Sequence, residues 1–111
     1  MEDKKIIRDI ESYIENNYLK VSFTISGISE ETKYSISHIE RKFKSIHTIP
    51  LKSYVITKRL SYAKMILKSN STIKIKDLAY NCGYDNSKSF TNIFKKYEGI
   101  TPGEYRKKYN L

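Results

Sequence analysis

The sequence predicts an all-α fold, and two observations carry that prediction. Its 111 residues include only four glycines and two prolines, too few for the many turns of a β-sheet protein of this size. Apolar residues recur at steps of three and four along most of the chain, which is the period of a helix with one buried face. A chain of this length fits one domain or two very small ones packed together.

Residues 4–17 are expected to form the first helix. Its apolar stripe consists of Ile6, Ile7, Ile10, Ile14 and Tyr18. Asp9, Glu11 and Glu15 avoid that stripe, so the helix has one apolar side. We expect it to brace the unit that follows.

A short helix over residues 25–32 and a one-sided helix over 36–46 are expected next. Ser35 has the side-chain oxygen that an N-cap uses to accept a free backbone N–H, so it marks the start of the later helix. The apolar stripe of that helix consists of Ile36, Ile39, Phe43 and Ile46.

Residues 51 to about 68 predict a long helix after Pro50. Its apolar residues cover more than one stripe, so we expect it to be packed from two sides. These residues are Tyr54, Val55, Leu60, Ala63, Ile66 and Leu67.

The remaining residues predict three shorter helices. One contains Ile75, Leu78 and Ala79 and stops at Gly83. The next is capped by Asp85 or Asn86, and its stripe consists of Phe90, Ile93, Phe94 and Tyr97. Thr101 and Pro102 open the last helix, which runs to Lys108.

The net charge of +9 is unevenly distributed. Residues 1–50 carry eight basic and eight acidic side chains, so all nine excess positive charges lie in residues 51–111. A basic half suits a polyanion, because lysines and arginines that neutralise phosphates release counterions. A solvated lysine-rich surface explains the charge equally well.

Several function classes find no support in the sequence. Cys82 is the single cysteine, and with His38 and His47 it makes no metal-ligand cluster. It is expected to act as a small hydrophobe. No catalytic constellation or glycine-rich phosphate loop is present. We therefore expect neither an enzyme nor a bound cofactor or metal.

The chain also lacks an apolar signal core and any run of about 20 apolar residues that would span a membrane. We therefore expect a cytoplasmic protein. The tyrosines at 62, 80, 97 and 105 have helical spacing. We expect them to be packed in the core or half-buried rather than to serve as stacking platforms.

A degenerate internal repeat organises the chain. Ile25 and Ile28 match Ile75 and Leu78 at an offset of fifty. Beyond the turn the offset is fifty-one, and four pairs match: Ile39 with Phe90, Phe43 with Phe94, Lys44 with Lys95, and Tyr54 with Tyr105. The extra residue falls in the turn, where an insertion is best tolerated. Each unit is a short helix, a tight turn and a one-sided helix, which is the helix-turn-helix pattern.

The segment IKDLAYNCGYDNSKSFTNIFKKYEGITPGEYR, residues 75–106, resembles the signature of the AraC/XylS family of transcription regulators. The long helix matches as well, with Arg59-Leu60, Ala63 and Leu67 in the family's order. The resemblance covers about residues 4–109. Tyr84 stands where the family commonly has Phe. In the first unit Ser29, Lys33 and Thr48 stand in place of Ala, Gly and Gly.

This resemblance implies about seven helices, with two helix-turn-helix units joined by a long central helix. The expected domain bounds are 1–50 for the first unit with its brace helix, 51–69 for the central helix and 70–111 for the second unit. It also implies that the recognition helices, at about 36–46 and 86–97, enter neighbouring major grooves of double-stranded promoter DNA. A central helix of about 18 residues is about 27 Å long, against a groove spacing of about 34 Å, so a monomer would reach both grooves with some DNA bending.

In the first recognition helix, the resemblance places Ser37, Glu40 and Arg41 at base-contacting positions. Arg41 is the strongest candidate reader, because a guanidinium can bond guanine O6 and N7 together. Glu40 would accept from a cytosine amine or orient Arg41, although a solvated helix charge is its plain alternative. His38 and Lys44 are interpreted as phosphate contacts.

The outward residues of the second recognition helix are small and polar or basic. Asn92 can bond adenine N6 and N7, and the Thr91 methyl can meet a thymine methyl. The family often has Arg at the Asn92 position, which indicates a weaker or different second half-site. The further base-reading candidates are Ser87, Lys88 and Ser89. The further phosphate-contacting candidates are Ser71, Thr72, Asn86, Lys95 and Lys96.

Two alternative functions stay open at this point, and so does the extent of the whole protein. One is an RNA-binding or general nucleic-acid module, and another is a helical protein-interaction module or anti-activator that keeps the fold without binding specific DNA. The chain is either a stand-alone regulator, expected to be a monomer on DNA, or the C-terminal part of a longer protein that dimerises through a separate N-terminal domain. Activation is the family's usual mode, which implies RNA polymerase as a further partner.

Overall fold

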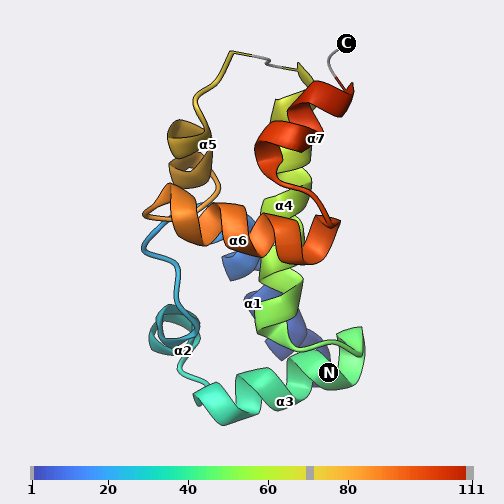
Figure 1. Ribbon diagram of the computed structural model, residues 1–111. Coiled ribbons are helices and arrows are strands. Elements are labelled where there is room, and N and C mark those ends of the chain that lie inside the picture. Colours follow the sequence, from blue (N-terminus) through green and yellow to red (C-terminus); the bar gives the residue numbers. More distant parts are fainter. Residues whose placement is uncertain (1, 70–71, 110–111) are drawn as a thin grey trace. The chain divides into compact units, whose positions relative to one another are not determined.

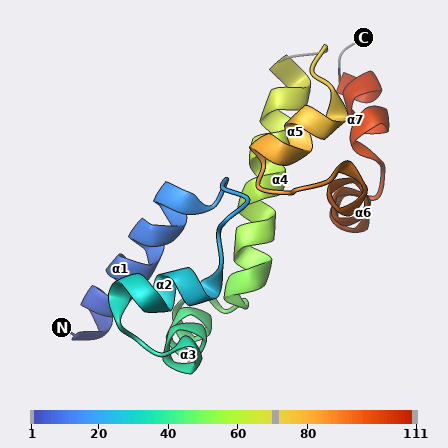
Figure 2. The same cartoon turned by 90° about the vertical axis from the view of Figure 1, so that its left-hand side faces the viewer.

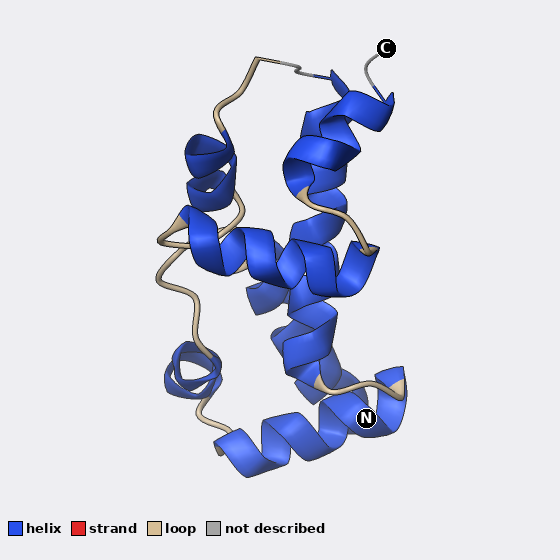
Figure 3. Ribbon diagram, in the orientation of Figure 1, coloured by secondary structure: helices blue, strands red, loops and turns tan. Residues whose placement is uncertain are grey.

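A computed structural model describes residues 2–69 and 72–109, and every regular element in those ranges is an α-helix (Figures 1 and 3). The helices are α1 (Glu2–Asn17), α2 (Ile25–Thr32), α3 (Ile36–His47), α4 (Leu51–Ser69), α5 (Ile75–Asn81), α6 (Ser87–Glu98) and α7 (Pro102–Tyr109). The predicted all-α fold with seven helices is confirmed. No helix in the described ranges is both long enough and apolar enough to cross a membrane.

The chain forms two compact units. Unit 1 contains the described residues up to Tyr18 together with Ser22–Thr57, and unit 2 contains Leu19–Val21 and the described residues from Lys58 onward. The boundary therefore falls within α4. Three residues between α1 and α2 belong to unit 2, although both of those helices belong to unit 1.

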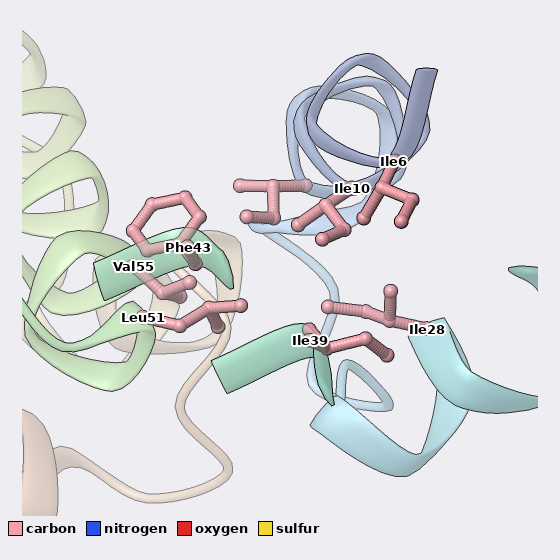
Figure 4. Packing of buried hydrophobic residues seen from close by; sticks show 8 residues of the cluster. Ile6, Ile10, Ile28, Ile39, Phe43, Leu51 and Val55 are labelled. Atoms are coloured by element: carbon pink, nitrogen blue, oxygen red, sulfur yellow. The ribbon is translucent and has the colours of Figure 1, made fainter. Parts of the chain in front are cut away.

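The core of unit 1 is the apolar stripe of α1 packed against α2, α3 and the start of α4 (Figure 4). Phe43 is completely buried, and its ring lies edge-on to Tyr54 with the ring centroids 4.9 Å apart. Burial of side chains of this size contributes about 1.5–3 kcal/mol each. The cluster consists of Ile6, Ile10, Ile14, Ile28, Ile39, Phe43, Leu51 and Val55. Helix α1 thus packs against both helices of the first helix-turn-helix.

Two members of the expected stripe on α3, Ile36 and Ile46, do not join this core, and Ile36 is 40% exposed. Ile46 is 57% exposed. It lies in the last full turn of α3, where it lines a shallow surface depression with Lys4, Ile7, Arg8 and Glu11 rather than the interior. The apolar spacing of α3 therefore continues beyond the part of the helix that the neighbouring helices cover.

Unit 2 is built around a row of aromatic rings. The ring centroids of Tyr84 and Phe90 are 5.7 Å apart, those of Phe90 and Phe94 are 5.8 Å apart, and those of Phe94 and Tyr105 are 5.6 Å apart. Such tilted and edge-on arrangements are the favourable ones for aromatic pairs. The other buried apolar residues of this unit are Leu60, Ala63, Leu67, Leu78, Ala79 and Cys82.

The tyrosines divide between core and surface. Tyr105 is buried and Tyr62 is half-buried, as expected. The expectation is wrong for Tyr80, which is 64% exposed, and for Tyr97, which is 42% exposed. Tyr80 follows the buried Leu78 by two residues, about 200° around α5, and so points away from the core.

Candidate nucleic-acid interface

The first helix-turn-helix consists of α2, a tight turn and α3 (Figure 2). Lys33 ends α2 in the left-handed region with φ 68°, and its N–H donates to the Ser29 carbonyl. Lys33 therefore adopts the left-handed conformation of the glycine that it replaces. Ser35 then caps α3, with its hydroxyl oxygen accepting from the His38 N–H at 3.1 Å. The predicted N-cap is confirmed.

On α3, the candidate residues Ser37, Glu40, Arg41 and Lys44 are all exposed. They follow one another at helical positions i, i+3, i+4 and i+7, so they share one face. Ile39 and Phe43 hold the opposite side in the core. We call these four residues the α3 face. Its single carboxylate stands directly beside its guanidinium in the sequence.

The phosphate candidates near this face have different environments. His38 is half-buried, and its ring lies edge-on to Tyr34 with centroids 5.9 Å apart. The His38 ring therefore packs partly against Tyr34 in the turn. Thr72 is exposed, and Ser71 lies outside the described residues.

In unit 2, α5 and α6 form the second helix-turn-helix. Gly83 is in the left-handed region with φ 94°, and the Tyr84 N–H returns to the Ala79 carbonyl at 2.9 Å. Asn86 caps α6, with its side-chain oxygen accepting from the Ser89 N–H at 2.8 Å. Of the two expected caps, Asn86 is therefore the one used. Its amide nitrogen also donates to Asp85, so the whole side chain is engaged at the helix start.

The α6 residues equivalent to the α3 face, fifty-one positions on, are Lys88, Thr91, Asn92 and Lys95. We call them the α6 face. Lys88, Asn92 and Lys95 are exposed, and Thr91 is half-buried. Among the other candidates, Ser89 and Lys96 are exposed, whereas Ser87 is half-buried. The α6 face carries two ammonium groups and no carboxylate, in contrast to the α3 face.

Two features bear on chemistry other than DNA binding. Burial raises the pKa of the Cys82 thiol to about 12, so the thiolate that reacts or binds metal is scarce at neutral pH. The described residues contain no group of three His, Cys, Asp or Glu side chains placed to hold a metal ion.

Sequence reasoning assigned no role to one side chain of unit 2. Arg59 of α4 lies over the ring of Tyr84, with its guanidinium carbon 5.0 Å from the ring centroid. Its neighbours come from segments far apart in the sequence, so periodicity alone does not reveal them.

Comparison with known proteins agrees with this geometry. A family model described as a helix-turn-helix domain matches residues 28–108. The transcriptional activator AarP of Providencia stuartii is 32% identical over 101 residues, which are 91% of this chain and 73% of AarP. The chain spans only 34% and 42% of two other curated relatives, both regulators from Escherichia coli.

Solved structures show the same fold. The C-terminal domain of the response regulator yesN from Fusobacterium nucleatum matches with a TM-score of 0.83 and 33% identity, covering 96% of this chain and 99% of that one. The DNA-binding domain of AdpA, solved with a target DNA, matches with a TM-score of 0.79 at 20% identity, covering 94% of this chain and 91% of that one. The family is one of transcription regulators rather than enzymes. The chain belongs to the AraC-type family of helix-turn-helix transcription regulators.

Proposed function

We propose that this chain binds double-stranded promoter DNA through α3 and α6 and so regulates transcription. The observation that carries the proposal is the pair of matched faces. Two capped helices, each in its own helix-turn-helix, present polar side chains at the same four positions while their apolar sides are buried. A recognition helix uses such a face in the major groove.

On the α3 face we assign base reading to Arg41, with Glu40 and Ser37 beside it. Among the described residues, neither Arg41 nor Glu40 makes a hydrogen bond or ion pair. The Arg41 guanidinium therefore gives up no protein contact on meeting a guanine edge. A bidentate arginine–guanine pair supplies about 1–3 kcal/mol of discrimination against other bases.

On α6 we assign base reading to Lys88, Asn92 and Thr91, with Ser87 and Ser89 as further candidates. Because Thr91 and Ser87 are half-buried, short side chains at these positions reach less of a base edge than Arg41 does. We infer that α3 supplies most of the sequence choice.

Phosphate contacts are assigned to residues that flank the two faces. Lys44, Lys95 and Lys96 are exposed cations, which position a protein on DNA without reading sequence. For Asn86 the contribution is indirect, since its side chain is used in the cap and only orders the first turn of α6. The remaining phosphate assignments are His38, Ser71 and Thr72.

We further propose that one copy of the chain engages both half-sites, that it acts in the cytoplasm, and that it activates transcription with RNA polymerase as a partner. AarP, of which this chain covers 73%, is described as a transcriptional activator.

Selection of binding sequences from a random DNA pool tests the proposal. The wild type should enrich two short motifs spaced by about one helical turn. Arg41→Ala should lose preference at one base position, weakening binding to the selected site by about 1–3 kcal/mol. Asn92→Ala should lose less.

Arg8→Ala is the matched control, because Arg8 is an exposed arginine on α1. It should leave the preference unchanged. Absence of a mobility shift on every DNA would instead support a protein-interaction module. Unchanged preference in Arg41→Ala would remove Arg41 as a reader.

A further inference from the structure

Arg59 joins three separate segments of unit 2. Besides lying over Tyr84, its guanidinium donates to the Lys20 carbonyl at 3.3 Å. Lys20 belongs to Leu19–Val21, the short stretch between α1 and α2 that is part of unit 2. One side chain from α4 thus contacts both this stretch and the turn that precedes α6.

The contact with the turn is close enough to constrain it. A Cβ placed on Gly83 would lie 2.7 Å from the Arg59 guanidinium carbon and 2.8 Å from its Nε. Side-chain atoms essentially never approach so closely, so the guanidinium packs directly on the glycine backbone. Gly83 has φ 94°, and the turn therefore needs glycine for both its conformation and its neighbour.

The next residue strengthens this interpretation. The Tyr84 ring contacts both the Arg59 guanidinium and the ring of Phe90 in α6, with the two ring centroids 5.7 Å apart. The Tyr84 hydroxyl is buried without a hydrogen-bond partner. The ring of Tyr84 therefore links the Arg59 guanidinium to the first turn of α6, which contains Phe90.

We propose that Arg59 is a positioning residue for DNA binding, one that fixes the turn between α5 and α6 and with it the direction in which the α6 face is presented. This inference rests on the proposed function. Arginine suits the place because a planar guanidinium can stack on a ring while donating in its own plane, which a lysine ammonium cannot do. Arg59 does not touch DNA in this proposal.

The test compares Arg59→Lys with the wild type on two DNAs: the selected site, and the same site with its α6 half scrambled. Binding is measured well below the unfolding temperature and over a range of salt concentrations. On the selected site, Arg59→Lys should bind about tenfold more weakly, or about 1.4 kcal/mol. On the scrambled site it should match the wild type, and the salt slope should be unchanged because lysine keeps the positive charge.

Arg8→Lys, on the exposed side of α1, should bind both DNAs like the wild type. Unchanged affinity of Arg59→Lys for the selected site would overturn the proposal, and so would an equal loss on both DNAs. A phosphate contact instead would appear in Arg59→Gln, which removes the charge, as a salt slope lower by about one. Failure of the wild type to bind the selected site would contradict the proposed function, a separate result.

A second variant covers the case in which Arg59→Lys does not fold. Tyr84→Leu keeps an apolar side chain in the core but removes the ring beneath the guanidinium. It should show the same loss confined to the intact α6 half-site. In the double variant, the loss should be smaller than the sum of the two single losses, because both disrupt one contact. Additive losses, or no loss in Tyr84→Leu, would overturn the proposal.

Discussion

The two helix-turn-helix units need the same two left-handed backbone positions but fill them differently. In unit 1 these positions hold Lys33, with φ 68°, and Thr48, with φ 64°. In unit 2 their counterparts are Gly83 and Gly99, with φ 94° and 86°. A non-glycine residue in this region is strained by about 1–2 kcal/mol, and a β-branched one is the rarer case. The fold thus imposes the conformation whatever residue is present.

The recognition faces differ in the opposite direction. The α3 face of the strained unit 1 carries an arginine and a glutamate, whereas the α6 face of unit 2, with its relaxed turns, carries lysines and small polar groups. Backbone strain and the side chains that we propose as the main base readers therefore lie in the same unit. The second unit combines glycine turns with positive charge, which suits positioning on the phosphate backbone.

The largest expected difference lies within unit 2. Gly83→Ala should lower the free energy of unfolding by about 2–3 kcal/mol, because left-handed strain adds to displacement of the Arg59 guanidinium from its contacts with Tyr84 and the Lys20 carbonyl. Gly99→Ala should lower it by only about 1–2 kcal/mol, since a Cβ there meets nothing within 4 Å. Urea unfolding followed by circular dichroism measures both. Equal losses would show that the contact with Arg59 adds nothing to backbone strain.

The next comparison concerns charge. Lys44→Ala and Lys95→Ala remove the equivalent ammonium groups of the two faces. Each should weaken DNA binding about eightfold in 0.1 M salt and reduce the salt slope by about one, with base preference unchanged. Affinity measured at several salt concentrations gives the slope. If Lys95→Ala altered preference while leaving the slope intact, Lys95 would be a base reader.

Strain in unit 1 should be removable. Thr48→Gly should raise the free energy of unfolding by about 1 kcal/mol, because a β-branched residue leaves the left-handed region. Part of the gain is offset by the greater freedom of glycine in the unfolded chain and by loss of the hydrogen bond from the Thr48 hydroxyl to the His47 carbonyl. Lys33→Gly should gain less, as lysine is not β-branched. A loss of stability in Thr48→Gly would contradict the strain argument.

Local patterns were enough to predict the helices and their caps. Ser35 and Asn86 cap α3 and α6 as the sequence indicates, because capping depends on residues only three positions apart. Exposure depends instead on where partner helices end. The stripe on α3 therefore predicted a buried Ile46 that is in fact at the surface.

The role of Arg59 was beyond sequence reasoning for a related reason. Its contacts join residues 20, 59 and 83–84, and no periodicity links segments so far apart. Tyr80 was within reach, since a helical wheel of α5 places it opposite Leu78. The roles of the individual residues on the α3 and α6 faces stay predictions until binding is measured.

The smallest expected difference between the units is their response to alkaline pH. Cys82 at the end of α5 is completely buried, and burial raises its pKa from 9.0 to about 12. Its counterpart in unit 1, Thr32, has no group that ionises in this range and donates its hydroxyl to the Ile28 carbonyl at 2.7 Å. Only unit 2 therefore contains a thiol that ionises more readily when the chain unfolds.

The pKa of the Cys82 thiol is higher in the folded protein than in the unfolded chain, so well below pH 9 its ionisation does not change the free energy of unfolding. Between about pH 9 and 12 the thiol ionises in the unfolded chain but not in the folded protein, and the free energy of unfolding falls. Between pH 7 and 9.5 this amounts to about 0.8 kcal/mol. Urea unfolding of the wild type and Cys82→Ala under reducing conditions isolates it, since lysines and tyrosines titrate alike in both. The stability difference between the two proteins should shift by that amount in favour of Cys82→Ala. A constant difference would mean that the thiol is as accessible to ionisation in the folded protein as in the unfolded chain.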